Sequence, residues 1–254
     1  MIQEYQLTKP YAKGFYNVSD EEIQWIRISE GCPNQCPYCA ETWENGKEPI
    51  YYELPEIIRN RVNILDMNLI YKPKALEIIQ ELGRRRVNGK VIYYSLQCGI
   101  DYRYLTQEIA SALKQAHFIE MRFAWDYSYN QAYKIEDAKK KLVYAGYNPK
   151  DMQVFMIANW KIPAKEYLMK LKTLKHWGLQ VSDCWFDNQK KGQVIPIHWT
   201  KEEIDYVGEE CRDHNIMIRH NGIQVEKIKD GGAISPELLL ASPSCQAKLS
   251  NMEG

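Results

Sequence analysis

The chain has no excess of charge of either sign. Its 33 Lys and Arg residues are balanced by 33 Asp and Glu residues over 254 positions. A nucleic-acid-binding domain commonly has a pI above about 9, so no global field draws this chain to nucleic acid or to anionic lipid. Charge therefore disfavours a nucleic-acid partner, although a local basic patch stays open.

The sequence also lacks a long apolar run. The first residues, MIQEYQLTKPYAKGFY, contain no apolar stretch of signal-peptide length. No later stretch approaches the roughly 18 apolar residues that a membrane span requires. We therefore predict a cytoplasmic protein with no membrane partner.

Internal repeats and low-complexity segments are absent; strand-like runs alternate with helix-like segments instead. A helix-like segment follows each of the first six strand-like runs, and this order predicts a parallel sheet with helices outside it. The helical patterns are clearest from Ala75 and from Ile109, where apolar residues recur at i, i+3, i+4 and i+7. The strand-like runs cover residues 23–29, 62–68, 91–97, 119–126, 152–159 and 179–187, with a seventh, peripheral strand near 216–220.

Helix ends carry signals of their own. Gly146 and Gly178 stand where two helices should stop, and Thr200 with Glu203 forms a capping box at the start of another. The predicted fold is α/β: a complete or partial (β/α)6 barrel of the TIM type. We expect an N-terminal lead-in over 1–22, the core barrel over 23–229 and a loosely held C-terminal tail over 230–254.

Three of the seven cysteines fall within the stretch CPNQCPYC, directly after the first predicted strand. In a barrel this position lies at the C-terminal face, where active sites are built. A structural zinc site or a ferredoxin cluster needs four protein ligands, whereas the other cysteines and the five histidines stand alone in the sequence. Three thiolates leave one coordination position open, which is how a metal site does chemistry.

The spacing of Cys32, Cys36 and Cys39, with Tyr38 in the aromatic place, resembles the C-x3-C-x-aromatic-C signature of the radical S-adenosylmethionine (SAM) enzymes. The order of strands and helices over about 20–190 resembles that family too. The resemblance implies a 4Fe-4S cluster held by the three cysteines, with SAM bound to the fourth iron. It also implies an external electron donor such as flavodoxin or ferredoxin, and formation of a 5'-deoxyadenosyl radical that abstracts hydrogen from a substrate.

Residues for SAM are less clearly marked, because the family's Gly-Gly-Glu type motif after strand 2 is replaced by ILDMN. Asp66 and Asn68 alternate around Met67 and therefore project to one side, where they can accept hydrogen bonds from the SAM ammonium group. In the alternative interpretation, both residues cap the following helix.

Further SAM contacts follow from the family pattern at later strand ends. Asp126 ends the fourth predicted strand, where family members often bind the ribose hydroxyls, and Ser95 and Gln97 on the third strand are rival candidates. Ile157 and Asn159 on the fifth strand are candidates for adenine contact, although Ile157 also suits the plain core.

The sequence does not name the substrate. A small molecule or a peptide is expected, and a nucleobase stays open. Modification of RNA or DNA is disfavoured by the zero net charge. Cys98 follows the third predicted strand, and Cys184 lies in the sixth. Each is either a thiol that faces the pocket or a small buried apolar group. The alternative function is a non-catalytic iron-sulfur or zinc-binding module that acts as a scaffold or binds a partner.

Overall fold

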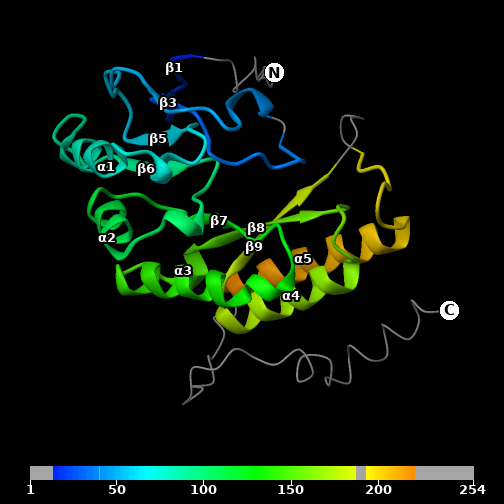
Figure 1. The fold of residues 1–254 in the computed structure, drawn as a ribbon. Helices are drawn as coiled ribbons and strands as arrows, with labels where there is room; N and C mark the ends of the chain where they lie inside the picture. The colour runs from blue at the N-terminus through cyan, green and yellow to red at the C-terminus, as the bar shows by residue number, and fades with distance from the viewer. Residues whose placement is uncertain (1–13, 40, 187–192, 221–254) are drawn as a thin grey trace. The chain divides into compact units, whose positions relative to one another are not determined.

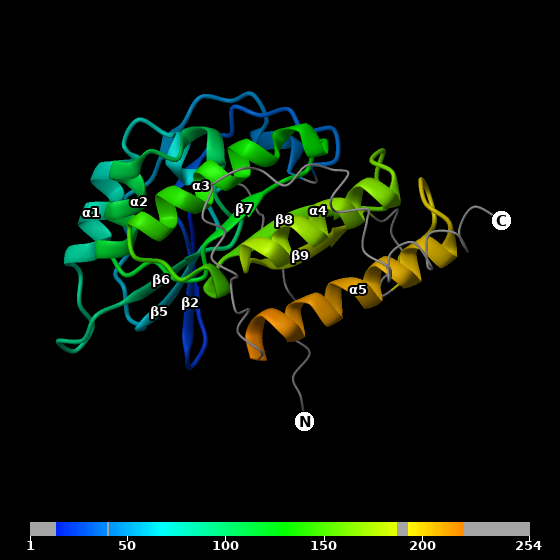
Figure 2. The same cartoon turned by 90° about the horizontal axis from the view of Figure 1, so that it is seen from below.

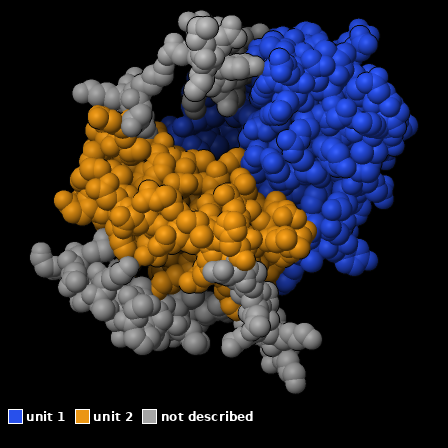
Figure 3. Space-filling view, turned by 180° about the vertical axis from the view of Figure 1, so that it is seen from behind, with its two compact units in different colours: residues 1–124, 140–147 blue, residues 125–139, 148–254 orange. Residues whose placement is uncertain are grey.

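The computed structural model describes residues 14–39, 41–186 and 193–220. These fall into two compact units, the first comprising 1–124 with 140–147 and the second 125–139 with 148–254 (Figure 3). One of the three boundaries between these chain segments lies inside helix α3, Ala132–Tyr144. The predicted tail over 230–254 lies outside the described residues, and the single core over 23–229 stays a prediction.

The first unit is built on a four-stranded sheet in the order β1-β2-β5-β6 (Figure 1). Strands β2, β5 and β6 run parallel, whereas β1 is antiparallel to β2. Ile26, Ile64 and Leu96 stand in register across the three parallel strands and are all buried. The strands cover Tyr16–Ser19 (β1), Ile23–Arg27 (β2), Arg61–Ile64 (β5) and Tyr93–Leu96 (β6), and β7 covers Arg122–Ala124.

Helices α1 (Ala75–Arg84) and α2 (Gln107–Gln115) of this unit contact one another (Figure 2). Gly83 permits their close approach, because a Cβ placed there would lie only 2.9 Å from the Cβ of Ala116. The buried residues of α1 include Ala75, Ile79 and Leu82, which follow the predicted helical spacing. Both helices were expected from this periodicity, and the structure confirms them.

The segment after β2 differs from the expectation. We predicted a helix there, but the described residues form the strand pair β3 (Ser29–Glu30) and β4 (Ile50–Tyr51), with the short 3-10 turn η1 (Thr42–Glu44) between them. The prediction of a helix after the first strand is therefore wrong among the described residues. Apolar residues do not recur every 3.6 positions in this segment, whose sequence is RISEGCPNQCPYCAETW. The pattern therefore does not favour a helix.

The second unit contains the parallel strands β8 (Gln153–Ala158) and β9 (Gln180–Trp185), with α4 and α5 packed along them (Figure 2). Helix α4 covers Ala164–Trp177 and ends at Gly178 in the left-handed conformation, as expected. Helix α5 covers Lys201–His220 and begins at the predicted capping box: Thr200 and Glu203 exchange backbone-to-side-chain hydrogen bonds of 2.8 and 3.2 Å.

The predicted seventh strand near 216–220 is wrong, because α5 continues through these residues. Its buried positions, Ile204, Val207, Cys211, His214 and Ile218, recur at helical spacing. The mixed α/β class and the parallel strand pairs are confirmed within each unit, whereas the barrel stays a prediction. None of the described helices combines the length and apolar character needed to cross a membrane.

Candidate functional site

The cysteine segment lies at the carboxyl end of β2 and is held by backbone hydrogen bonds. The N–H of Cys32 donates to the carbonyl of Glu44 at 3.0 Å, and the N–H of Gly46 donates to the carbonyl of Cys32 at 2.7 Å. A turn bond of 3.0 Å joins the N–H of Cys39 to the carbonyl of Cys36. The chain reaches Cys32 through Gly31, whose positive φ of 97° suits glycine.

The three thiols are neighbours, and none of them forms a disulfide. Burial raises the pKa of the Cys32 thiol, and the charges of Cys36 and Cys39 raise it further. The pKa of Cys39 is also raised, first by burial and then by Cys36 and Glu41. This mutual influence shows that the loop gathers the three sulfur atoms into one electrostatic neighbourhood.

A donor set of three neighbouring free thiols fits an iron-sulfur cluster. In such a cluster each thiolate binds a different iron, so the sulfur atoms need not converge on one point. Within the described parts of the chain, no three His, Cys, Asp or Glu side chains converge on a position for one metal ion.

Glu44 lies beneath this loop and is fully buried. The N–H of Gly31 donates to its Oε2 at 2.9 Å, while Oε1 is buried without a hydrogen-bond partner among the described residues. Burial raises the pKa of Glu44 to about 7, and the nearby charges of Arg27 and Lys72 oppose the rise. Glu44 therefore contacts the cysteine loop through hydrogen bonds of its backbone and side chain. Its carboxylate also interacts by charge with two buried cations, Arg27 and Lys72.

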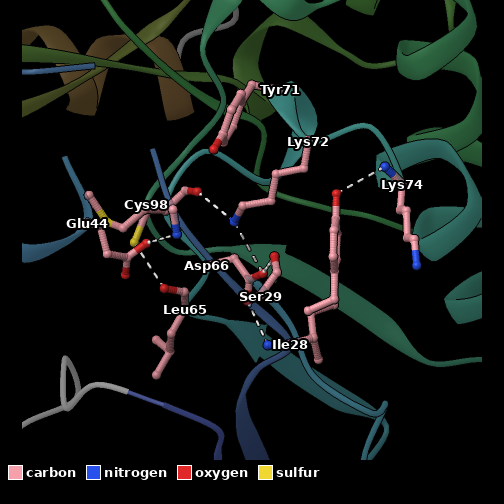
Figure 4. Close-up of polar contacts among 12 residues, drawn as sticks. Ile28, Ser29, Glu44, Leu65, Asp66, Tyr71, Lys72, Lys74 and Cys98 are labelled. Carbon is pink, nitrogen blue, oxygen red and sulfur yellow. Dashed lines mark hydrogen bonds and ion pairs between the residues drawn. The ribbon is translucent and has the colours of Figure 1, made fainter. Parts of the chain in front are cut away.

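Asp66 is the centre of a buried network between β2 and the segment that follows β5 (Figure 4). The N–H of Ile28 donates to Oδ1 at 2.9 Å, and the hydroxyl of Ser29 donates to Oδ2. The ammonium group of Lys72 lies 3.7 Å from Oδ2 and donates to the carbonyl of Met67 at 3.0 Å. Because Asp66 and Lys72 both have fully buried side chains, the carboxylate is engaged inside the protein.

Burial acts on both charges of this pair. It raises the pKa of Asp66 above its ordinary value of 3.8, and Lys72 and Ser29 oppose the rise. Burial also lowers the pKa of Lys72, against the opposing charges of Asp66 and Glu44. The geometry thus gives Asp66 a role in joining two strand ends, and SAM contact by this residue stays a prediction.

Asn68 is placed differently, although it was expected to act with Asp66. It has the left-handed φ of 46° and only 8% of its surface is exposed. Its Nδ2 donates to Oδ2 of Asp101 at 3.3 Å, whereas its Oδ1 is buried without a hydrogen-bond partner among the described residues. Such an oxygen is an acceptor that a bound donor could satisfy.

Ser95 and Gln97 lie on or just beyond β6 and contact one another. Nε2 of Gln97 donates to the hydroxyl of Ser95 at 3.1 Å, and Nη1 of Arg122 donates to the same hydroxyl at 3.2 Å. Arg122 also forms an ion pair with Glu120 at 2.7 Å. The two predicted residues therefore share a polar cluster in the first unit, which stays a candidate for ribose contact.

Two candidates in the second unit occupy buried positions. Ile157 is 7% exposed and belongs to the core. Asn159 is fully buried, and its Nδ2 donates to the carbonyls of Phe186 and Ile195 at 3.0 and 2.6 Å. Its Oδ1 accepts from three successive backbone N–H groups at 3.1 to 3.3 Å, those of residues 197–199. Asn159 thus fixes a loop, and a contact with adenine stays a prediction for both residues.

The remaining predicted residues lie in less buried places. Tyr38 and Asp126 are half-buried. Burial lowers the pKa of Lys170 to about 8 and raises the pKa of Cys184 to about 12, and the charge of Asp126 raises both pKa values as a smaller effect. Cys184 is exposed, while the half-buried Cys98 has its pKa raised to about 12 by burial. These placements leave the predicted roles of all four residues untested.

The sequence interpretation missed a polar cluster formed by Asn34, Asp101 and Arg103. Asn34 lies midway between Cys32 and Cys36, and its Nδ2 donates to Oδ2 of Asp101 at 3.0 Å. Nη2 of Arg103 donates to Oδ1 of Asn34 at 2.8 Å. One available signal was that Asp101 follows a parallel strand at its carboxyl end, where ligands of α/β folds bind.

No protein-family model matches the chain, and no curated protein matches it. Among solved structures, the chain is similar to TsrM, a radical S-adenosylmethionine methyltransferase from Kitasatospora setae with cobalamin and a 4Fe-4S cluster bound. The TM-score is 0.53 and the identity 11%, and the match covers 63% of this chain but only 36% of TsrM. At this identity the likeness concerns the fold, so we conclude that the chain shares fold features with a radical SAM enzyme.

Proposed function

We propose that the chain is a radical SAM enzyme in which Cys32, Cys36 and Cys39 hold a 4Fe-4S cluster. The chemistry supplied by the bound cluster and SAM is reductive cleavage of SAM to a 5'-deoxyadenosyl radical, which abstracts hydrogen from a substrate. The proposal includes a small-molecule or peptide substrate and an external electron donor such as flavodoxin or ferredoxin.

One observation carries this proposal: three free, electrostatically coupled thiols stand on a loop at the carboxyl end of the first parallel strand. Loops at this end of parallel strands are where α/β folds bind their ligands. The fold likeness to TsrM supports the same assignment at the level of the fold.

In this proposal Asn68 receives the ammonium group of SAM. Its Oδ1 is a buried acceptor without a partner among the described residues, and a donor placed there would remove the cost of an unsatisfied buried oxygen. The oxygens of Asp66 already accept hydrogen bonds from Ile28 and Ser29, and Oδ2 pairs with Lys72. In this proposal Asp66 therefore stabilises the surrounding structure and does not bind SAM itself.

Iron content after anaerobic reconstitution tests the cluster. We expect about four irons per chain, as a 4Fe-4S cluster requires. Cys36→Ala should lose iron binding, whereas Cys184→Ala, which removes an exposed thiol outside the motif, should keep it. Zinc in place of iron would exclude the proposed enzyme and favour the non-catalytic module. Full SAM cleavage by Cys36→Ala would exclude the assignment of the cluster to these three cysteines.

A melting experiment tests SAM separately. A ligand that binds only the folded state adds roughly 2.7 kcal/mol at about 100 times its dissociation constant. We expect SAM to raise the melting temperature of cluster-loaded protein and to raise that of metal-free protein much less. Equal shifts would mean that SAM binds independently of the cluster.

A further inference from the structure

Asp101 stands outside the cysteine motif, yet it contacts the middle of the cysteine loop. Its side chain is 8% exposed and pairs with the guanidinium group of Arg103. Nε of Arg103 donates to Oδ1 at 2.7 Å and Nη2 donates to Oδ2, so the pair has the bidentate geometry that fixes both groups. A carboxylate held in this way is an acceptor with a fixed orientation.

The first group that this carboxylate orients is the amide of Asn34. Asp101 accepts from its Nδ2 at 3.0 Å, while Arg103 donates to its Oδ1 at 2.8 Å. Both polar atoms of Asn34 are therefore engaged by one ion pair. Because Asn34 is two residues from Cys32 and two from Cys36, this contact ties the centre of the cysteine loop to the segment after β6.

The second group is the amide of Asn68. The same Oδ2 of Asp101 accepts from its Nδ2 at 3.3 Å. An ionised carboxylate can only accept, so the amino side of the amide must face Asp101 and the carbonyl oxygen must face elsewhere. Asp101 thereby determines that Asn68 offers an acceptor, which attracts a cation, in place of a donor, which would repel one.

We infer that Asp101, braced by Arg103, is a positioning residue that sets both the cysteine loop, through Asn34, and the cation-accepting oxygen of Asn68. The part that concerns SAM rests on the proposed function. The inference links two events: the geometry of the loop that receives the cluster, and the affinity for the ammonium group of the ligand beside it.

The first test uses metal-free protein and therefore does not depend on the cluster. Cys32 is only 5% exposed, and its protection depends on the tied loop. In Asp101→Asn the amide cannot accept from both asparagines and pair with Arg103, so iodoacetamide should label Cys32 at least several-fold faster, as followed by mass spectrometry. Asn34→Ala should give the same result. Glu81→Gln, which breaks an exposed ion pair on α1, is the matched control and should label like the unchanged protein.

The second test measures SAM affinity of the reconstituted protein by titrating the electron paramagnetic resonance signal of the reduced cluster. Asp101→Asn should raise the dissociation constant about tenfold or more, and Asp101→Glu should restore part of the loss. In an Asn68→Ala background, Asp101→Asn should weaken SAM binding less than it does in the unchanged protein, because the part of the effect that acts through the oxygen of Asn68 is already lost. A general folding defect would instead give additive losses.

The outcomes separate the two claims. Unchanged labelling of Cys32 in both Asp101→Asn and Asn34→Ala would overturn the loop half of the inference. Unchanged or additive SAM affinities would overturn the half that concerns Asn68, with the proposed function intact. If the unchanged protein took up no iron, the proposed function and the SAM half would both be refuted, and the labelling test would still decide the loop.

Discussion

Replacing Lys72 by Met should destabilise the protein through Asp66. The two side chains are fully buried, and their charged groups lie 3.7 Å apart. Met has nearly the length of Lys, so the substitution removes the ammonium group and leaves little empty volume. What remains is a buried carboxylate that accepts from the N–H of Ile28 and the hydroxyl of Ser29, with the charge of Arg27 as a smaller support.

Removing one partner of a buried ion pair costs about 3–5 kcal/mol of unfolding free energy. For a chain of this size, each kcal/mol lowers the melting temperature by about 2–4 °C, so we expect a fall of about 6–20 °C. Urea unfolding followed by circular dichroism measures the free energy. Lys74→Met is the matched control, because Lys74 is exposed and only two residues away, and it should change stability by less than about 0.5 kcal/mol.

The loss should also depend on pH. The pKa of Asp66 in the folded protein is raised above its ordinary value, and removing Lys72 raises it further. A group whose pKa is higher in the folded state stabilises that state at low pH and loses this contribution as pH rises through the folded pKa. Lys72→Met should therefore be less destabilised at pH 5 than at pH 8.

A second variant separates charge from packing. Asp66→Asn combined with Lys72→Met removes both charges, so it should be more stable than Lys72→Met alone. The reasoning would be refuted if Lys72→Met and Lys74→Met had the same unfolding free energy. It would also be refuted if the loss of unfolding free energy in Lys72→Met, relative to the unchanged protein, were the same at both pH values.

Three further substitutions test other parts of the structure. Gly31→Ala should reduce iron uptake, since a Cβ would lie 2.9 Å from two backbone carbonyl oxygens; Gly89→Ala, with a positive φ but open space, is the control for backbone strain and should keep its iron. Asn159→Ala should lower the unfolding free energy by about 2 kcal/mol or more, because five backbone groups, four of them partly buried and one buried, lose their partner; a urea unfolding curve that gives the same free energy as the unchanged protein would contradict this. Thr200→Ala should cost about 1 kcal/mol in the same measurement through loss of the helix cap, and no change would show that Glu203 alone suffices.

Local patterns predicted most of the regular structure. Five of the six strand-like runs contain a whole strand: β2, β6, β7, β8 or β9. The run over 62–68 contains β5 except for Arg61, because short apolar, β-branched runs favour strands. The prediction of a strand near Ile216 failed, because three apolar residues in a row, 216–218, fit a strand as well as the end of a long helix. The buried residues from Ile204 to Ile218 recur at helical spacing, and Thr200 caps the helix start. These two signals together indicate a helix.

The candidate site was less predictable than the fold. The cysteine spacing carries its own chemical meaning, so the loop could be found from the sequence. The difference between Asp66 and Asn68 could not, because alternation along a strand places both on one side while only the packing of Lys72 shows which carboxylate oxygens are occupied. Asp101 and Asn34 are 67 positions apart, and sequence spacing gives no information on such a contact.

The backbone pairing around Cys32 has a consequence for the proposed cluster site. Classical zinc fingers are unfolded without metal, so their binding energy is largely folding energy. Here strands β3 and β4, the bond from Tyr52 to Ile28 and the bonds between Cys32 and residues 44–46 form the base of the loop from protein groups alone. The chain itself therefore forms the base of this loop, so the cluster of the proposed function would not be needed to fold it.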